Sequence, residues 1–383
     1  MISTQLKQVT RFASRRAGFL FLMALAGVLW HNRRLWEQNR ITLSERCLQP
    51  LPAWERWPTP PFVTVLVAAW NEKENLGAHL QSFLNVCYPH KELILCVGGE
   101  DGSYQQAKEW AGKQITVLEQ QPGEGKYRAL KRALPHAKGT VIYLTDADCI
   151  LNSESFEQLL YPIASGQETI TTGLFKPFRH QQSNPFVRYQ WAMRQYAQAT
   201  RSYHYLNQLA GANCMLQRSV VEAGWQVDEI AIAEDLYLGL QAVKAGHRIL
   251  QVRHSVVETE FPESYPQYMA QQTRWLRGLL LFGAQMNELS HVRHVLRTAF
   301  IGLILLIMPL MSLIFGKIGY MGWLLSWSAT AVARVRYMWV LNETEQPHVS
   351  PFSSALLTIM LTDFVIWSRV LFEMLREESK NRW

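Results

Sequence analysis

The sequence predicts an α/β protein with a Rossmann-like, mostly parallel sheet and with transmembrane helices toward both ends. Two observations support this prediction. From Val63 onward, short apolar runs alternate with helical patterns, which is typical of a parallel sheet with helices on both faces. Uncharged apolar segments lie before and after this region. The 383 residues are enough for one domain of ordinary size and several membrane segments.

The alternation predicts individual strands and helices. Strands are predicted at residues 63–68, 92–97, 115–118 and 141–145. Helices are predicted at residues 75–86, 103–111, 126–137, 185–201, 235–245 and 264–286. In open sheets of this class, ligands bind at the carboxyl ends of the strands. Polar residues that directly follow a strand are therefore the first candidates for a site.

Four parts are predicted along the chain: an N-terminal membrane anchor (1–40), a proline-rich extended linker (41–61), an α/β domain ending in an interfacial helix (62–290), and C-terminal transmembrane segments (291–383). The anchor contains an uncharged run at 17–30. As a helix this run is about 21 Å long, shorter than the ~30 Å hydrocarbon core of a bilayer. We expect a short span or an interfacial helix, with a buried helix of a soluble domain as the alternative.

The C-terminal part contains uncharged segments at 298–315 and 318–333, which predict a membrane hairpin. The segment at 352–370 carries Asp363 and Arg369, so whether it spans is left open. Arginines at both ends of the hairpin place the central domain in the cytoplasm by the positive-inside rule. We expect a multi-pass integral membrane protein with a cytoplasmic α/β domain.

Charge and cysteine content exclude some functions. The net charge is +7, and basic residues gather beside the apolar segments, as in Arg15-Arg16 and Arg33-Arg34. This favours a membrane as partner, and no nucleic-acid-binding motif accompanies the charge, so nucleic acid is not expected. The five cysteines form no CxxC pair, which argues against a zinc or redox site.

Asp146 and Asp148 give the strongest local signal because they follow the predicted strand at 141–145. Two carboxylates at positions i and i+2 can share one hard cation, and Mg²⁺ or Mn²⁺ is typically bridged by such groups to substrate phosphates. The alternative is an ordinary solvated turn. At the end of a buried strand we predict a metal site.

Glu234 and Asp235 lie at the start of the predicted helix at 235–245. Carboxylates in a first helical turn interact favourably with the helix dipole, so capping is one interpretation. The other is a general base, which accepts the proton of an attacking hydroxyl group. Spacing alone leaves both open.

Gln271, Arg274 and Trp275 occupy positions i, i+3 and i+4 of a predicted helix and so share one face. An arginine can bind phosphate oxygens, and a tryptophan offers a flat face to a sugar ring. The alternative is an interfacial helix with basic and aromatic anchors beside a membrane.

Together these segments make the chain similar to a family 2 glycosyltransferase with the glycosyltransferase A fold, from about Val63 to Gly278. Five segments in the family's order carry the resemblance: Val-Ala-Ala-Trp-Asn-Glu at 67–72, Gly-Lys-Tyr-Arg-Ala-Leu at 125–130, Asp-Ala-Asp at 146–148, Glu-Asp at 234–235 and Gln-Gln-Thr-Arg-Trp at 271–275, which matches QxxRW.

The resemblance implies a nucleotide-sugar donor, with a UDP-sugar favoured, and an inverting single displacement. It implies these positions for the site residues: Asn71, Glu72 and Asp101 near the base and ribose, Lys126 at the nucleotide or its phosphates, Asp146 and Asp148 at the metal, Gln271, Arg274 and Trp275 at the donor, and Asp235 as the base with Glu234 beside it. With membrane segments on both sides, the expected acceptor is a lipid or a lipid-linked glycan.

The chain departs from the family pattern at two places. Residues 97–103 read Val-Gly-Gly-Glu-Asp-Gly-Ser where Asp-Asp-Gly-Ser is usual, so Asp101 is expected to take part of the role of an aspartate that holds the base. Residues 211–213 read Gly-Ala-Asn where long-chain polymer synthases often carry an aromatic motif. Three alternatives stay open: a processive polysaccharide synthase, a non-catalytic membrane scaffold of the same fold, and a nucleotidyltransferase.

Overall fold

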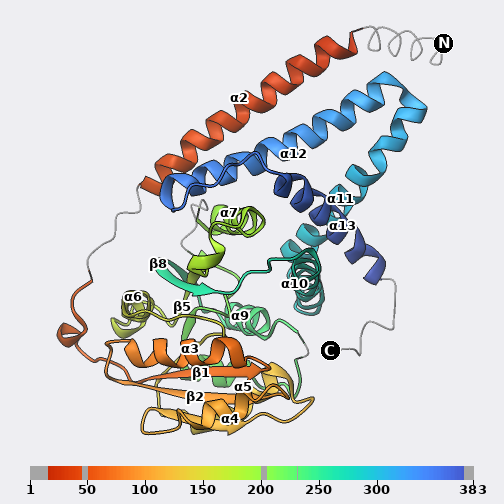
Figure 1. Cartoon of the computed structure of the whole chain (residues 1–383). Coiled ribbons are helices and arrows are strands. Elements are labelled where there is room, and N and C mark those ends of the chain that lie inside the picture. The colour runs from red at the N-terminus through yellow and green to blue at the C-terminus, as the bar shows by residue number, and fades with distance from the viewer. Residues whose placement is uncertain (1–15, 45–50, 200–204, 231, 375–383) are drawn as a thin grey trace. The chain divides into compact units, whose positions relative to one another are not determined.

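The computed structural model describes residues 16–44, 51–199, 205–230 and 232–374. Figure 1 shows the chain with its elements labelled. The strands are β1 (Val63–Trp70), β2 (Lys91–Gly98), β3 (Ile115–Glu119), β4 (Val141–Leu144), β5 (Ile170–Pro177), β6 (Tyr205–Leu206), β7 (Cys214–Gln217) and β8 (Ile249–Thr259).

The α-helices have these bounds: α2 (Ala17–Ser44), α3 (Lys73–Asn85), α4 (Ser103–Lys108), α5 (Gly125–Ala133), α6 (Ser153–Ala164), α7 (Pro185–Ala199), α8 (Arg218–Gly224), α9 (Glu234–Lys244), α10 (Tyr265–Gln285), α11 (Leu289–Phe315), α12 (Lys317–Thr344) and α13 (Ser354–Met374). Every helix predicted from the sequence is present within the described residues, although the one predicted at 103–111 ends at Lys108 and residues 200–201 of the one predicted at 185–201 lie outside them. The predicted helix at 126–137 ends early, because Pro135 cannot donate a backbone hydrogen bond and the last turn becomes a 3-10 helix, Leu134–His136.

The chain divides into two compact units. Among the described residues, the sheet unit comprises 51–179, 205–230 and 232–261, and the helical unit comprises 16–44, 180–199 and 262–374. Helices α7 and α10 therefore pack with the C-terminal helices, although the sequence suggested a domain that ran unbroken from 62 to 290. The four predicted parts of the chain remain a prediction.

The sheet unit contains one mixed sheet of eight strands in the order β3-β2-β1-β4-β7-β5-β8-β6. The first four strands are parallel, with Val63 opposite Lys91 on one side and Val141 on the other. Strand β7 pairs antiparallel with both β4 and β5, and β5 runs parallel to β8. The predicted mostly parallel α/β sheet is confirmed, and its parallel half brings the ends of β1, β2 and β4 to one edge.

The two faces of the parallel strands are covered by different helices. Cys96 of β2 contacts the carbonyl of Ala129 in α5 across 3.2 Å, so α5 lies on one face. Alternate strand residues point to the other face, where α3, α4 and α6 cover them. This second face forms the largest core cluster, which includes Val63, Val65, Val67, Leu93, Leu95, Leu76, Leu80, Phe83, Ala107, Phe156, Leu159 and Leu160.

The predicted linker, residues 41–61, is not extended throughout, because it contains helical segments where the structure describes it. Helix α2 continues to Ser44, and a 3-10 helix forms at Trp54–Arg56. Trp57 is buried, and its indole nitrogen donates to the carbonyl of Pro52. Trp54 and Trp57 both pack against Tyr88. Burial of these large aromatic side chains favours this path of the chain over a fully extended one.

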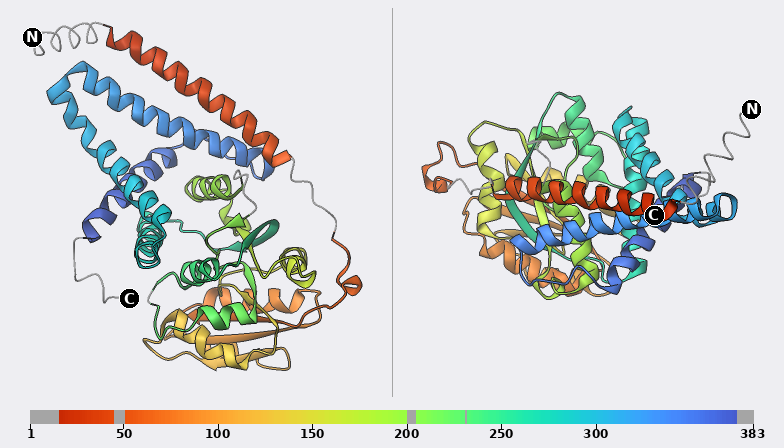
Figure 2. Two further views of the ribbon diagram at one scale, coloured as in Figure 1. Left: turned by 180° about the vertical axis from the view of Figure 1, so that it is seen from behind. Right: turned by 90° about the horizontal axis from the view of Figure 1, so that it is seen from above.

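The helical unit consists of long helices that pack lengthwise. Helix α2 runs beside α12, and α11 contacts both α12 and α13, as Figures 1 and 2 show. The predicted membrane segments lie in α2, α11, α12 and α13. Within the described residues, only Leu289–Leu310 is both long and apolar enough to cross a membrane. Many large apolar side chains of this unit are exposed, among them Phe19, Leu22, Trp30, Phe300, Leu310, Leu313 and Phe315.

Candidate active site

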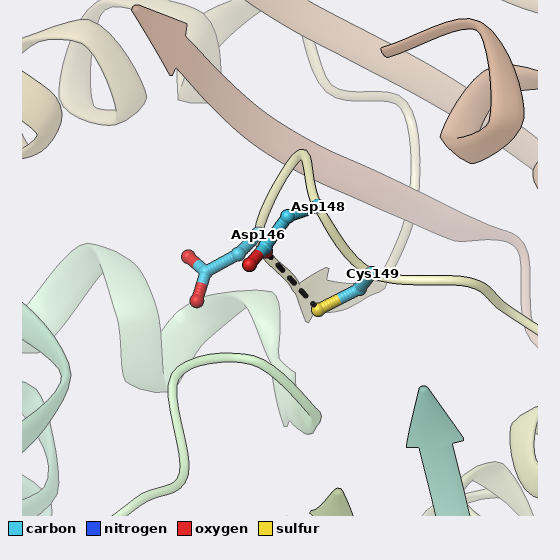
Figure 3. A group of neighbouring side chains, drawn as sticks. All are labelled: Asp146, Asp148 and Cys149. Carbon is cyan, nitrogen blue, oxygen red and sulfur yellow. Dashed lines mark hydrogen bonds between the residues drawn. The ribbon is translucent and has the colours of Figure 1, made fainter. Parts of the chain in front are cut away.

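The loop after β4 carries Asp146 and Asp148, and Figure 3 shows their side chains with that of Cys149. Groups from other elements fix the shape of this loop. The hydroxyl of Thr259, the last residue of β8, donates to Asp148 Oδ2 across 2.9 Å. Buried His79 of α3 lies with its Nδ1 2.7 Å from the carbonyl of Cys149. Since burial lowers the pKa of His79, the ring is neutral and can donate to this carbonyl. Neither Thr259 nor His79 stood out in the sequence, because each reaches the loop only through the fold.

The chemistry of this loop fits a divalent cation. The ligand atoms of Asp146, Asp148 and Cys149 lie within 4.8 Å of one another. Burial, together with Asp148 and Asp146, raises the pKa of the Cys149 thiol, and the thiol donates weakly to the Ala212 carbonyl across 3.6 Å. Burial and the charge of Asp146 raise the pKa of Asp148 to about 6. A hard cation would be held by the two carboxylates, whose mutual repulsion it would relieve.

Lys126 joins the two acidic segments of the site. It is the second residue of α5, and its Nζ lies 2.6 Å from Asp146 Oδ1 and 2.6 Å from Glu234 Oε1. Desolvation lowers the pKa of Lys126, but Asp146, Glu234 and Asp235 outweigh it and raise the pKa well above its ordinary value. The ammonium therefore stays charged and holds the loop after β4 beside the start of α9. The sequence predicted Lys126 at the nucleotide or its phosphates and did not predict this pairing.

Asp235 lies in the first turn of α9 and is held by two backbone groups. Its Oδ2 accepts from Gly211 N across 3.0 Å, and its Oδ1 accepts from Leu236 N across 2.8 Å. Burial and the neighbouring charge of Glu234 raise its pKa to about 6. A carboxylate with a pKa near neutrality is well suited to accept a proton at physiological pH. Capping alone would stabilise the charged form and lower the pKa.

Gly211 allows this approach. A Cβ built on Gly211 would lie 2.7 Å from Asp235 Oδ2, so any side chain would push the carboxylate away from the backbone N–H. Gly211 belongs to the Gly-Ala-Asn segment at 211–213, where long-chain polymer synthases often carry an aromatic motif. Its contact with Asp235 could not be seen without the fold.

Asn71 and Asp101 connect the loops that follow β1 and β2. Asn71 has a positive φ of 58°, and its side-chain oxygen accepts from Glu100 N across 2.8 Å. A Cβ on Gly99 would lie 2.2 Å from that oxygen, so the glycine is required for this contact. Asp101 accepts from Lys73 N and Ser103 N, each across 2.9 Å, and these bonds, with that from the Ser103 hydroxyl, outweigh desolvation and lower its pKa. The predicted roles of Asn71 and Asp101 at the base and ribose remain predictions.

Glu72 lies nearer to the acidic centre. Burial and the charge of Asp148 raise its pKa to about 7, and Glu260 contributes in the same direction. Its backbone N–H donates to the hydroxyl of Ser103 across 2.9 Å. Glu72 therefore lies near Asp148 and Asp146, while Lys126 pairs with Asp146 and Glu234.

The QxxRW residues belong to the helical unit. Gln271 Oε1 accepts from Arg194 Nη2 across 2.6 Å, and the Arg194 guanidinium lies 4.1 Å from the centre of the Trp275 ring. Arg274 is exposed. The three motif residues therefore lie on one helix as predicted, but two of them share a contact with α7 and the third faces outward. Their predicted place at the donor remains a prediction.

The mixed sheet, the paired carboxylates after β4 and the acidic start of α9 define a domain of the glycosyltransferase A type. The chain belongs to the family described as "Glycosyltransferase like family 2", whose model matches residues 60–278, more than half of the chain. It therefore carries a glycosyltransferase domain, as the sequence predicted.

Individual proteins resemble the chain over much of its length. It is 26% identical over 267 residues to the probable glycosyltransferase YdaM of Bacillus subtilis, which covers 63% of this chain and 62% of that protein. It is 22% identical over 231 residues to the beta-monoglucosyldiacylglycerol synthase of Trichormus variabilis, covering 57% and 49%. The chain thus spans about half to 62% of the length of these two relatives.

A solved structure is similar in fold. This is the mannosyltransferase PcManGT from Pyrobaculum calidifontis, in complex with GDP-Man and Mn²⁺. It superposes with a TM-score of 0.52 at 16% sequence identity and covers 96% of this chain and 99% of that one. At this identity the likeness supports the fold alone.

Proposed function

We propose that the protein is a membrane-bound glycosyltransferase that moves a sugar from a nucleotide-sugar donor to a lipid or lipid-linked glycan. One observation carries the proposal: Lys126 holds Asp146 of the predicted metal loop and Glu234 of the predicted catalytic pair within 2.6 Å of one ammonium group. This contact fixes the cation ligands beside Asp235. A scaffold without catalysis would not need to gather so many partly buried carboxylates, since each costs free energy to desolvate.

In the proposed reaction, Asp235 accepts the proton of the acceptor hydroxyl as that oxygen attacks the anomeric carbon. The bond from this carbon to the nucleotide diphosphate breaks in the same step, which inverts the configuration. Gly211 N–H and Leu236 N–H each donate to one oxygen of the Asp235 carboxylate and so fix its orientation. Its pKa of about 6 leaves it ionised at neutral pH and still basic enough to take the proton.

The donor's diphosphate is expected beside Lys126 and the metal loop. Asp146 and Asp148 would hold Mg²⁺ or Mn²⁺, with Thr259 fixing the orientation of Asp148. When bound, such a cation would neutralise the charge that builds on the departing diphosphate. Asn71, Glu72 and Asp101 line the loops where the base and ribose are proposed to bind. The donor nucleotide is proposed to be UDP, and GDP is the alternative that PcManGT's complex with GDP-Man suggests.

The membrane proposal rests on the helical unit. Leu289–Leu310 can cross a bilayer, and α2 and α11 expose many large apolar side chains. We propose that α2, α12 and α13 also lie in the membrane, that the sheet unit is cytoplasmic, and that α10, with Gln271, Arg274 and Trp275, lies at the interface. The name of the Trichormus variabilis relative, a glucosyldiacylglycerol synthase, is consistent with a lipid acceptor.

Membranes containing the expressed protein test the proposal when they are incubated with radiolabelled UDP- and GDP-sugars and Mn²⁺. Label should enter the lipid phase from at least one donor, and the product should be of single-transfer size on gel filtration. A long polymer would favour the processive synthase instead. If no donor labels lipid or glycan, the assignment of function fails. Release of the protein by a carbonate wash would separately contradict membrane insertion.

A further inference from the structure

Arg194 is a partly buried arginine of α7 that contacts two residues of the QxxRW segment at once. Its Nη2 donates to Gln271 Oε1 across 2.6 Å. Its guanidinium lies 4.1 Å from the centre of the Trp275 ring. Gln271 and Trp275 are four residues apart on α10 and so lie one above the other on the same face. A single guanidinium can therefore reach both.

An arginine suits this position for a physical reason. The planar guanidinium can stack on an aromatic ring and donate hydrogen bonds from its edge at the same time, which a lysine ammonium cannot. Burial lowers the pKa of Arg194 to about 9, which indicates that the charge is poorly hydrated. A poorly hydrated cation gains more from an amide oxygen and a ring face than an exposed one does. Arg194 thus fixes the side-chain orientation of Gln271 and the plane of Trp275.

We propose that Arg194 is a positioning residue that holds Gln271 and Trp275 in the orientation that sugar transfer requires. The inference rests on the proposed function and on the predicted place of these two side chains at the donor. It has two consequences for the motif. Arg194 covers one face of the Trp275 ring, so a sugar would stack on the other. Arg274 is the exposed residue of the motif, and its guanidinium is the one that would bind a phosphate.

Helix α10 has other attachments that do not involve Arg194. The Tyr268 hydroxyl donates to Asp363 of α13 across 2.8 Å, and Asp363 is also paired with Arg334 of α12. Ser264 caps the helix through a reciprocal pair with Gln267. Loss of Arg194 should therefore loosen the motif residues without releasing the helix.

The test compares Arg194→Gln and Arg194→Lys with the wild type in full-length, detergent-solubilised protein. Arg188→Gln is the matched control, because Arg188 lies on the same helix and is fully buried but donates to Asn342 and the Glu345 carbonyl. Two quantities are measured: kcat/KM for transfer, and amide hydrogen exchange of residues 265–285.

We expect Arg194→Gln to lower kcat/KM about 10- to 100-fold, since small misplacements at an active site cost on the order of 10²-fold. Exchange should speed up at residues 271–277 alone. Arg194→Lys should not restore activity, and the double variant Arg194→Gln/Trp275→Ala should lose less than the product of the two single losses. Arg188→Gln should lower Tm while leaving both local exchange at 271–277 and kcat/KM of the folded fraction near those of the wild type.

Normal turnover of Arg194→Gln, losses that multiply in the double variant, or unchanged exchange at 271–277 would each overturn the proposal. Failure of the proposed function has a different signature: the wild type itself transfers no sugar. In that case the exchange measurement decides alone whether Arg194 fixes this segment, and unchanged exchange still overturns the inference.

Discussion

The ammonium of Lys126 lies 2.6 Å from Glu234 Oε1, in a contact that joins the start of α5 to the start of α9. The same nitrogen lies 2.6 Å from Asp146 Oδ1. Two segments far apart in the sequence are thus held by one charge. This arrangement fixes the position of the proposed cation ligands relative to the proposed base before any substrate binds.

Lys126→Met should disturb the relative position of the cation ligands and the base. Without the ammonium, Asp146, Glu234 and Asp235 repel one another across a partly buried site, so we expect at least about a 10²-fold loss of kcat/KM. Lys126→Arg keeps the charge and should retain more activity than Lys126→Met. Steady-state kinetics of the two variants provide the measurement. Equal activity of Lys126→Met and the wild type would show that the pairing has no role in turnover.

Removal of metal should stop the reaction. EDTA followed by dialysis should abolish transfer, and Mn²⁺ or Mg²⁺ should restore it. Thr259→Val removes the hydroxyl that orients Asp148, and loss of such an outer contact typically costs about 10–100-fold in metal affinity. The variant should therefore need more Mn²⁺ for half-maximal rate and recover at saturation. Full activity in chelated, dialysed protein would contradict the metal site.

Gly211→Ala should displace the proposed base. The new Cβ would lie 2.7 Å from Asp235 Oδ2, so the carboxylate must move, and we expect kcat/KM to fall about 10²-fold. Gly112→Ala is the matched control in the same unit, because a Cβ there meets nothing within 4 Å. It should change activity less than about twofold. Similar kinetics for the two variants would mean that the Gly211–Asp235 contact is not needed.

The stability of the protein should report the state of Asp235. Because burial and Glu234 raise the pKa of Asp235 from 3.8 to about 6, the folded protein binds this proton more tightly than the unfolded chain. Its contribution to stability is present below about pH 4 and is lost as pH rises through about 6. As pH rises from about 4 to about 6, the free energy of unfolding of the wild type should therefore fall relative to that of Asp235→Asn. Chemical denaturation across this range measures the difference between the two proteins. A gain in stability of the wild type relative to Asp235→Asn as pH rises would support capping instead.

Much of the fold could be predicted because β1 to β4 are short apolar runs separated by helices with regular spacing. The second half of the sheet could not. Strand β7 has four residues and β6 has two, too few to show a period, and their antiparallel pairing depends on contacts with distant strands. The helical segments and the buried Trp57 within the predicted linker were not foreseen, because the prolines from Pro50 to Pro61 indicate an extended chain.

The site divides in a similar way. Asp146, Asp148, Glu234 and Asp235 could be proposed because each pair follows a strand or begins a helix, a position that local sequence reveals. The residues that hold them could not. Thr259, His79 and Gly211 act through single long-range contacts with no sequence spacing of their own, and Arg194 reaches its partners from another helix.

The most direct test of the central claim is sugar transfer by Asp235→Asn beside its binding of donor. The variant keeps the shape of the side chain but cannot accept a proton at neutral pH, so we predict that transfer falls about 10²–10⁴-fold. Affinity for the nucleotide sugar in Mn²⁺, measured by equilibrium dialysis, should change little. Asp228→Asn, at an exposed carboxylate of the same unit, should behave as the wild type in both measurements. Near-normal transfer by Asp235→Asn with intact donor binding would contradict the account.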